Sequence, residues 1–95
     1  MFQVTPSKRF AKSFRKLKTS GKFSDTTRND LAEIISILAR NAKLPIAFSD
    51  HALRGEFLGY RECHIRGDLL LVYRIYPDER IVVLNDIGSH AQLFG

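Results

Sequence analysis

The sequence contains a single cysteine, no tryptophan and only three prolines in 95 residues, and it has no long hydrophobic run. The lone cysteine, Cys63, excludes an intramolecular disulfide and is typical of a reducing compartment. The longest apolar stretches, such as Leu69–Tyr73, fall far short of the ~20 residues that cross a membrane as a helix. The first residues, Met1–Val4, lack the basic region and apolar core of a secretory signal. We therefore predict one cytoplasmic globular domain over residues 1–95, with no membrane segment.

Acidic residues are absent from the first 23 positions, which hold seven basic residues. The rest of the chain carries eight basic and ten acidic side chains, so the formal net charge of +5 comes from the N-terminal segment. A basic field of this kind attracts polyanions, and nucleic acid is the commonest polyanion in a cytoplasm. We expect a nucleic acid or an acidic protein as the partner of this segment, with a solvated basic helix face as the simpler alternative. The basic residues are Lys8, Arg9, Lys12, Arg15, Lys16, Lys18 and Lys22.

Hydrophobic periodicity predicts two helices in the first half of the chain, after a short strand at residues 2–4. Pro6 and Ser7 introduce the first helix, and Ser20–Gly21 ends it. Ser24 is the expected N-cap of the second helix, which should end near residues 41–42. Two such helices form an antiparallel hairpin with one shared apolar side. The inward-facing residues are Phe10, Phe14, Leu17, Leu31, Ile34, Ile35 and Leu38.

The second half of the chain has the period of two that is typical of strands. We predict strands at residues 60–65, 69–76 and 80–85, joined by turns at Gly67–Asp68 and Pro77–Asp78 into an antiparallel meander. A short helical turn, capped by Ser89, follows at residues 90–94. The predicted order is β-α-α-β-β-β, an α+β fold in which the helical hairpin packs on one face of the sheet.

This architecture leaves the second face of the sheet open to solvent or to a ligand. Cys63 and Ile65 suit the covered face, and alternation then directs Glu62 and His64 to the open face. The connection over residues 44–59 contains His51 and has no clear periodicity. Loops of this length inside a small domain usually have a function, so we expect His51 to take part in a site.

The three histidines, His51, His64 and His90, all follow the predicted helices. Three acids lie near them in the sequence, namely Asp50, Glu62 and Asp68. One interpretation is that each is a surface or structural histidine, the commoner role for a single histidine. A metal site is the second, but no paired spacing such as H-x-x-x-H is present, and we expect no metal and no cofactor. The third is acid–base catalysis on RNA without a metal, for which histidines, carboxylates and arginines are sufficient. The residues alone leave these interpretations open.

Four segments of the chain carry a more specific pattern. They are DHAL at 50–53 with Gly55, GYRECHI at 59–65, Asp68 followed by the strand that ends in LVY at 71–73, and GSHAQLFG at 88–95. In this order they resemble the YafQ-type branch of the RelE superfamily, the ribosome-dependent mRNA-cleaving toxins of bacterial toxin–antitoxin pairs. The resemblance covers nearly the whole chain, and in the helical half it follows pattern more than identity. The fold it implies is a RelE-like helical hairpin on an antiparallel sheet.

The resemblance also implies an activity, partners and site residues. A toxin of this kind enters the ribosomal A site and cuts mRNA without a metal, leaving a 2′,3′-cyclic phosphate. A cognate antitoxin, often an acidic-tailed DNA-binding protein, holds such a toxin inactive in the bacterial cytoplasm. The candidate catalytic residues are His51, His64, Asp68 and His90. The candidate substrate-binding residues are Phe94 and Glu62. The residues expected to contact ribosomal RNA are Lys8, Lys12, Arg15 and Lys16.

Two alternatives remain beside this prediction. Relatives with the same fold but without the histidines inhibit DNA gyrase, and a non-catalytic RNA-binding module would use the same basic face. The presence of all three histidines in register favours the ribonuclease. Leu69 stands where relatives can have a tryptophan, which removes one possible stacking platform and leaves base preference undetermined. Arg61 neighbours Glu62, but alternation directs it inward, and we leave it out of the predicted site.

Overall fold

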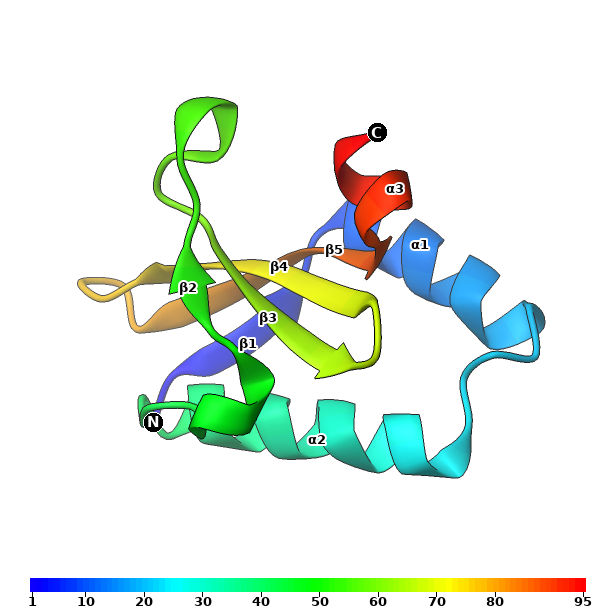
Figure 1. Cartoon of the computed structure of the whole chain (residues 1–95). Helices are drawn as coiled ribbons and strands as arrows, with labels where there is room; N and C mark the ends of the chain where they lie inside the picture. Colours follow the sequence, from blue (N-terminus) through cyan, green and yellow to red (C-terminus); the bar gives the residue numbers. More distant parts are fainter.

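The computed structural model describes residues 1–95 and has the predicted α+β fold (Figure 1). The strands form one sheet in the order β1-β5-β4-β3-β2, antiparallel throughout except for the parallel pair of β1 and β5. None of the helices combines the length and the apolar character needed to cross a membrane. In chain order the elements are β1 (Gln3–Pro6), α1 (Lys8–Thr19), α2 (Asp25–Ala39), η1 (Ile46–Phe48), β2 (His51–Ala52), η2 (Gly55–Phe57), β3 (Arg61–Arg66), β4 (Leu69–Tyr76), β5 (Ile81–Ser89) and α3 (His90–Phe94).

Both long helices begin at the serines that the sequence predicts. The Ser7 hydroxyl accepts a hydrogen bond from the Phe10 amide at 3.0 Å, and the Ser24 hydroxyl accepts one from the Thr27 amide at 3.2 Å. These amides lie in the first turns, where the helix itself offers no acceptor. The helix starts are therefore confirmed, and their cause is local.

Several boundaries differ from those predicted. β3 spans Arg61–Arg66 instead of residues 60–65, and β5 spans Ile81–Ser89 instead of residues 80–85. α2 ends at Ala39, earlier than expected, because Asn41 has a left-handed φ of 53° that cannot continue the helix. β1 covers Gln3–Pro6 instead of residues 2–4, since it pairs in parallel with β5 from Ile81 to Leu84. No local pattern in the sequence indicates a pairing between segments so far apart.

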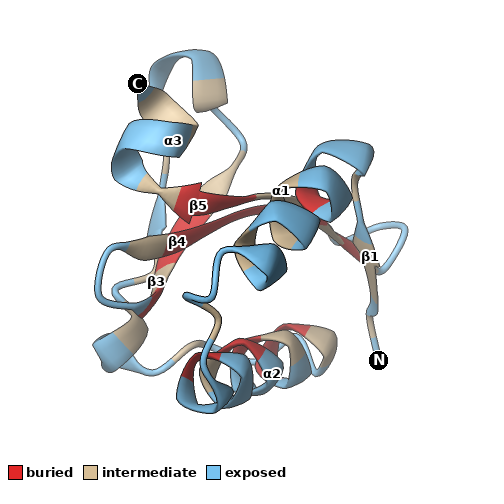
Figure 2. Cartoon of the chain, turned by 90° about the vertical axis from the view of Figure 1, so that its right-hand side faces the viewer, coloured by how far each residue is buried: buried red, intermediate tan, exposed pale blue.

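Helices α1 and α2 both lie on one face of the sheet, and the hydrophobic core fills the space between (Figure 2). α1 packs mainly on β5 and α2 on β3, so each helix approaches the sheet more closely than it approaches the other helix. α1 buries only Phe10, which leaves most of this basic helix exposed. The buried core residues are Phe10, Leu31, Ile34, Leu38, Cys63, Ile65, Leu71, Tyr73, Val82, Leu84 and Ile87.

The second face of the sheet is covered, which corrects the prediction of an open face. Leu70 and Val72 point to this face, and only 3% and 1% of their surfaces are exposed. The connection between β2 and β3 and the helix α3 both stand on this side, opposite α2 (Figure 1). Their aromatic side chains meet above the strands, where the ring centroids of Phe57 and Phe94 are 5.0 Å apart. Alternation thus predicts the side of the sheet correctly but not the exposure.

Candidate functional site

His51 and Glu62 form a pair at the outer edge of the sheet. The segment predicted as a loop contains β2, whose pairing with β3 sets His51 opposite Glu62. The His51 Nε2 atom lies 3.4 Å from Glu62 Oε1, and its Nδ1 atom lies 2.9 Å from the Ser49 carbonyl oxygen. Both neighbours are acceptors, so the ring satisfies both contacts when each of its nitrogens carries a proton. The exposed imidazole is therefore fixed from two sides.

Glu62 is more buried than the sequence predicts. We expected it to contact the substrate, but only 6% of the residue is exposed, and its carboxylate faces His51. A buried carboxylate needs a partner, and His51 supplies one. In this structure Glu62 therefore contacts His51, and its role in substrate binding stays a prediction.

Asp50 and Arg61, the neighbours of this pair in the chain, point to the face of the sheet that α1 and α2 cover. Arg61 Nη2 donates to the Asp50 carboxylate at 2.8 Å, and the Tyr73 hydroxyl donates to the same carboxylate. The hydrogen bond to Asp50 raises the pKa of Arg61, and burial, together with Asp50, raises the pKa of Tyr73. Because these groups satisfy one another, they anchor the chain just before His51 to the core. The inward direction predicted for Arg61 is confirmed.

Helix α3 holds His90 and Phe94 on the second face. The Ser89 hydroxyl accepts from the Gln92 amide at 3.2 Å, and the Gln92 side chain accepts from the Ser89 amide at 2.8 Å. This reciprocal arrangement is a capping box, which fixes the start of the helix. The ring centroids of His90 and Phe94 lie 5.3 Å apart, so the exposed imidazole rests beside the ring that meets the β2–β3 connection. The predicted cap of the terminal turn is confirmed.

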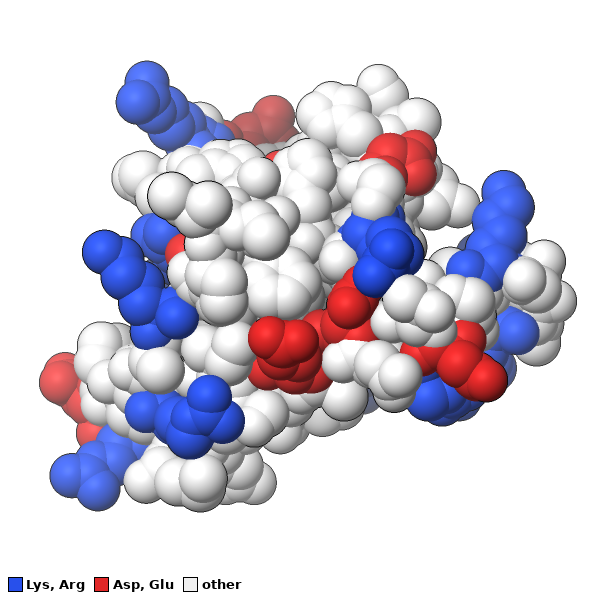
Figure 3. All heavy atoms as spheres, turned by 60° about the horizontal axis from the view of Figure 1, so that its bottom comes forward, with Lys and Arg blue, Asp and Glu red and all other residues white.

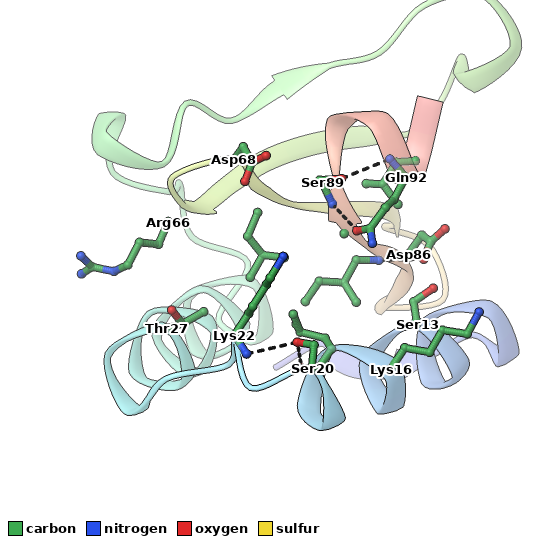
Figure 4. Close-up of a pocket in the computed structure, with 15 residues that line it drawn as sticks. Ser13, Lys16, Ser20, Lys22, Thr27, Arg66, Asp68, Asp86, Ser89 and Gln92 are labelled. Atoms are coloured by element: carbon green, nitrogen blue, oxygen red, sulfur yellow. Dashed lines mark hydrogen bonds between the residues drawn. The ribbon is translucent and has the colours of Figure 1, made fainter. Parts of the chain in front are cut away.

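His64 and Asp68 occupy different surroundings. His64 is half-buried on β3, opposite Leu70 of β4, on the same face as Glu62. Asp68 lies in the exposed turn between β3 and β4 and lines a cavity of about 710 Å³ between α1 and α3 (Figure 4). None of the three histidines lines this cavity. The structure thus places the histidines on one side and Asp68 at the end of the sheet.

The cavity connects Asp68 with the basic helix. Lys16 of α1 and Lys22 of the α1–α2 connection line it, and the Lys22 side chain extends into it in Figure 4. Arg66 points away from the cavity in the same view and donates to the Asp30 carboxylate at 2.7 Å. Lys22 belongs to the basic N-terminal segment for which the sequence predicts a polyanionic partner, although it is not among the four residues expected to contact ribosomal RNA.

The basic residues predicted to contact RNA lie on an exposed helix surface. α1 has no acidic residue, and the ion pairs of the structure join His51 to Glu62, Arg61 to Asp50 and Arg66 to Asp30. Seen from the side of α2, the surface instead carries acidic side chains near its centre and basic ones around them (Figure 3). The uncompensated positive charge is therefore concentrated on α1. The exposed members of the predicted contact are Lys8, Lys12, Arg15 and Lys16.

Two features of the site were missed in the sequence. The Ser49 carbonyl oxygen orients His51, and Phe57 supports Phe94. A backbone contact leaves no signal in a sequence, and a phenylalanine in a connection without clear periodicity does not reveal its partner. No group of three or more His, Cys, Asp or Glu side chains is placed to hold a metal ion.

Known proteins share this fold. The model of the family described as bacterial toxin of type II toxin–antitoxin system, YafQ, matches residues 2–95. The mRNA interferase toxin YafQ of Escherichia coli is 30% identical over 91 residues, which cover 85% of this chain and 97% of the relative. A metal-bound toxin from Helicobacter pylori has a TM-score of 0.86 at 36% identity, covering 99% of this chain and 100% of that chain. A chain of the E. coli DinJ–YafQ complex has a TM-score of 0.83 at 27% identity, with 100% of both chains covered. This chain therefore belongs to the YafQ family of bacterial toxins of type II toxin–antitoxin systems.

Proposed function

We propose that this toxin is an mRNA interferase, an endoribonuclease that cleaves mRNA on the ribosome by acid–base catalysis without a metal. The E. coli relative is named an mRNA interferase toxin, which supports the activity. The structural observation that supports this mechanism is a contact between two segments on the second face of the sheet. The segment with His51 continues to Phe57, which packs on Phe94 beside His90.

The proposed reaction needs one proton acceptor and one proton donor. The 2′-hydroxyl attacks the adjacent phosphorus and gives its proton to a base, while the bond from phosphorus to the 5′-oxygen breaks and that oxygen receives a proton from an acid. The products are a 2′,3′-cyclic phosphate and a 5′-hydroxyl. His90, exposed at the start of α3, is the main proton-transfer group in this proposal. His51, whose two nitrogens face acceptors, is its partner or a phosphate contact.

The other predicted residues take supporting places. His64 lies on the same face as the His51–Glu62 pair, and Asp68 borders the cavity that leads to α1. Phe94 offers a ring on which a nucleotide base can stack. The basic surface of α1, through Lys12 and its neighbours, is the proposed contact with ribosomal RNA in the bacterial cytoplasm.

A cognate antitoxin is the proposed protein partner. The E. coli relative is in a complex with DinJ, described as a toxin–antitoxin complex, and this relationship supports a similar pair here. The net charge of +5 favours an acidic antitoxin segment, which we expect to belong to a DNA-binding protein.

Primer extension on an mRNA bound to purified bacterial ribosomes tests the proposed activity. We expect cuts with the unaltered protein, in the presence of phenanthroline to remove transition metals, and a loss of at least about 100-fold with His90→Ala. Glu79→Ala, a change in the exposed turn between β4 and β5, is the control for purification and folding. Ribosome binding by His90→Ala should be unchanged, because a single exposed imidazole contributes little to a broad electrostatic contact.

Other outcomes of this assay would contradict parts of the proposed function. If the His90→Ala variant still cuts mRNA at the same rate, His90 does not take part in the reaction. If phenanthroline abolishes cutting by the unaltered protein, the reaction depends on a metal. A folded protein that binds ribosomes without cutting mRNA would instead be a non-catalytic binder.

A further inference from the structure

Arg74, on the second face of β4, is held between two tyrosine rings. Its Cζ atom lies 5.3 Å from the centroid of the Tyr60 ring and 5.1 Å from that of the Tyr76 ring. Gly59 forms a third wall, because a Cβ atom added there would lie 3.2 Å from the same Cζ atom. Gly59 also has a φ of 95°, which a residue with a side chain rarely adopts. The guanidinium is therefore confined on three sides.

The confined guanidinium has no anionic partner in this chain. The ion pairs of the structure involve other residues, so Arg74 differs from Arg61, whose fork is filled by Asp50. No buried side-chain nitrogen lacks a hydrogen-bond partner. Since the Arg74 nitrogens have no partner, they reach the solvent. A planar donor fork that is fixed, partly exposed and unpaired is suited to a phosphate or to the face of a base.

A continuous row of side chains links Arg74 to the candidate catalytic residues. The Tyr60 and Phe57 ring centroids are 6.5 Å apart, and Phe57 meets Phe94, which rests beside His90. On the sheet, Arg74 follows Leu70, the residue opposite His64, by four positions, which corresponds to about 13 Å along the strand. This separation sets Arg74 apart from His64 along the sheet. It suits a neighbouring nucleotide of the same strand.

We propose that Arg74, Tyr60 and Tyr76 form a subsite that binds one nucleotide of single-stranded RNA outside the catalytic cluster. The guanidinium contacts a phosphate, and the tyrosine rings stack on a base. This subsite rests on the proposed function, because it assigns RNA as the ligand of the same face. The flanking rings favour RNA over an acidic peptide, since a carboxylate needs the guanidinium but not the rings.

Binding of a fluorescent 2′-O-methyl oligoribonucleotide, followed by anisotropy, tests the subsite without any cleavage. We expect Arg74→Gln to weaken binding about tenfold and to lower the slope of log affinity against log salt by about 0.7. Arg40→Gln is the matched control, because Arg40 is the C-cap residue of α2, on the other side of the molecule, and its side chain hydrogen-bonds to Ser36. Tyr76→Leu should weaken binding without changing the salt slope, and thermal unfolding identifies any variant that has lost its fold.

Four outcomes would overturn the subsite. They are the absence of oligonucleotide binding by the unaltered protein, equal binding by the Arg74 and Arg40 variants, loss with Arg74→Gln but not with a folded Tyr76→Leu, and an equal loss of binding to a polyglutamate peptide. The ribosome cleavage assay separates this result from the proposed function. If the protein cleaves mRNA but Arg74→Gln does not weaken RNA binding, the proposed activity stands and the subsite is wrong. If RNA binding depends on Arg74 but the protein does not cleave mRNA, the subsite stands and the proposed activity is wrong.

Discussion

The buried thiol of Cys63 makes the stability of the protein depend on pH. Burial raises the pKa of this thiol from 9.0 to about 12, and the negative charges of Asp50 and Glu62 act in the same direction. The folded protein therefore keeps this proton at a pH where the unfolded chain releases it. Stability from this group is fully present below pH 9 and is lost as the pH rises from 9 to about 12. The same burial makes the thiol a poor nucleophile in the native state.

Replacing Cys63 with alanine should remove this component of the pH dependence. Between pH 8 and pH 10 the free energy of unfolding of the unaltered protein should fall by about 1.4 kcal/mol more than that of Cys63→Ala. Urea unfolding at the two pH values measures the difference. Tyr73, whose pKa is also raised, is present in both proteins and cancels in the comparison. Parallel changes in the two proteins would show that Cys63 ionises normally when folded.

Single residues show how far alternation predicts a site. A period of two correctly placed Arg61 and Cys63 on the inner face and Glu62 and His64 on the other. It could not predict that Glu62 would be buried, because burial depends on contacts such as the one with His51, which belongs to another strand. Direction is a local property of a strand, whereas exposure depends on what packs upon it.

Helix α3 depends for its stability on its N-cap and on a packing contact at its C-terminal end. A helix of five residues is far below the length that is stable alone, so its cap and its packing must hold it. Ser89 and Gln92 supply the cap, and Phe94 supplies the contact with Phe57. A side chain at Gly88 would displace part of this cap, since an added Cβ atom would lie 2.8 Å from Gln92 Oε1, which accepts from the Ser89 amide. The position of His90 follows from these contacts.

Ser89→Ala should therefore loosen α3 while leaving the sheet intact. Loss of an N-cap costs about 1 kcal/mol, which corresponds to roughly fivefold faster hydrogen exchange at the Gln92 amide. Amides of β4 should exchange as before, and mRNA cleavage should slow because His90 is held less firmly. Ser89→Asp is the control, since aspartate caps a helix N-terminus equally well. Unchanged exchange in Ser89→Ala would show that packing through Phe94 alone fixes the helix.

The elements that were predicted correctly are those with local causes. Ser7 and Ser24 cap the helices that follow them, and the turns between β3, β4 and β5 join neighbours in the chain. The parallel pairing of β1 with β5, and the short strand β2 that sets His51 opposite Glu62, were not predicted. Both depend on contacts between distant segments, for which neither helix periodicity nor turn residues give a signal.

At the scale of the whole molecule, positive charge is concentrated on the surface of α1. α1 carries basic residues without acids and exposes almost its full length, while the surface seen from α2 mixes both signs (Figure 3). The cavity bordered by Lys16 and Lys22 leads from α1 to Asp68 at the end of the sheet (Figure 4). A large polyanion bound along α1 would therefore extend toward the candidate catalytic side. This arrangement suits ribosomal RNA as the contact of α1 and mRNA as the ligand of the second face.

Neutralising α1 should weaken ribosome binding through its salt dependence. In the triple variant Lys12→Gln, Arg15→Gln and Lys16→Gln, the slope of log affinity against log salt should fall by about 2 to 3, since each lost phosphate contact removes about 0.9. Sedimentation with ribosomes at several salt concentrations measures the slope. A second triple variant loses the same charge on the α2 side and should keep the original slope, because the surface there already mixes both signs. Its changes are Arg28→Gln, Arg40→Gln and Lys43→Gln. Equal slopes in the two variants would mean that net charge, and not the surface of α1, directs the protein to the ribosome.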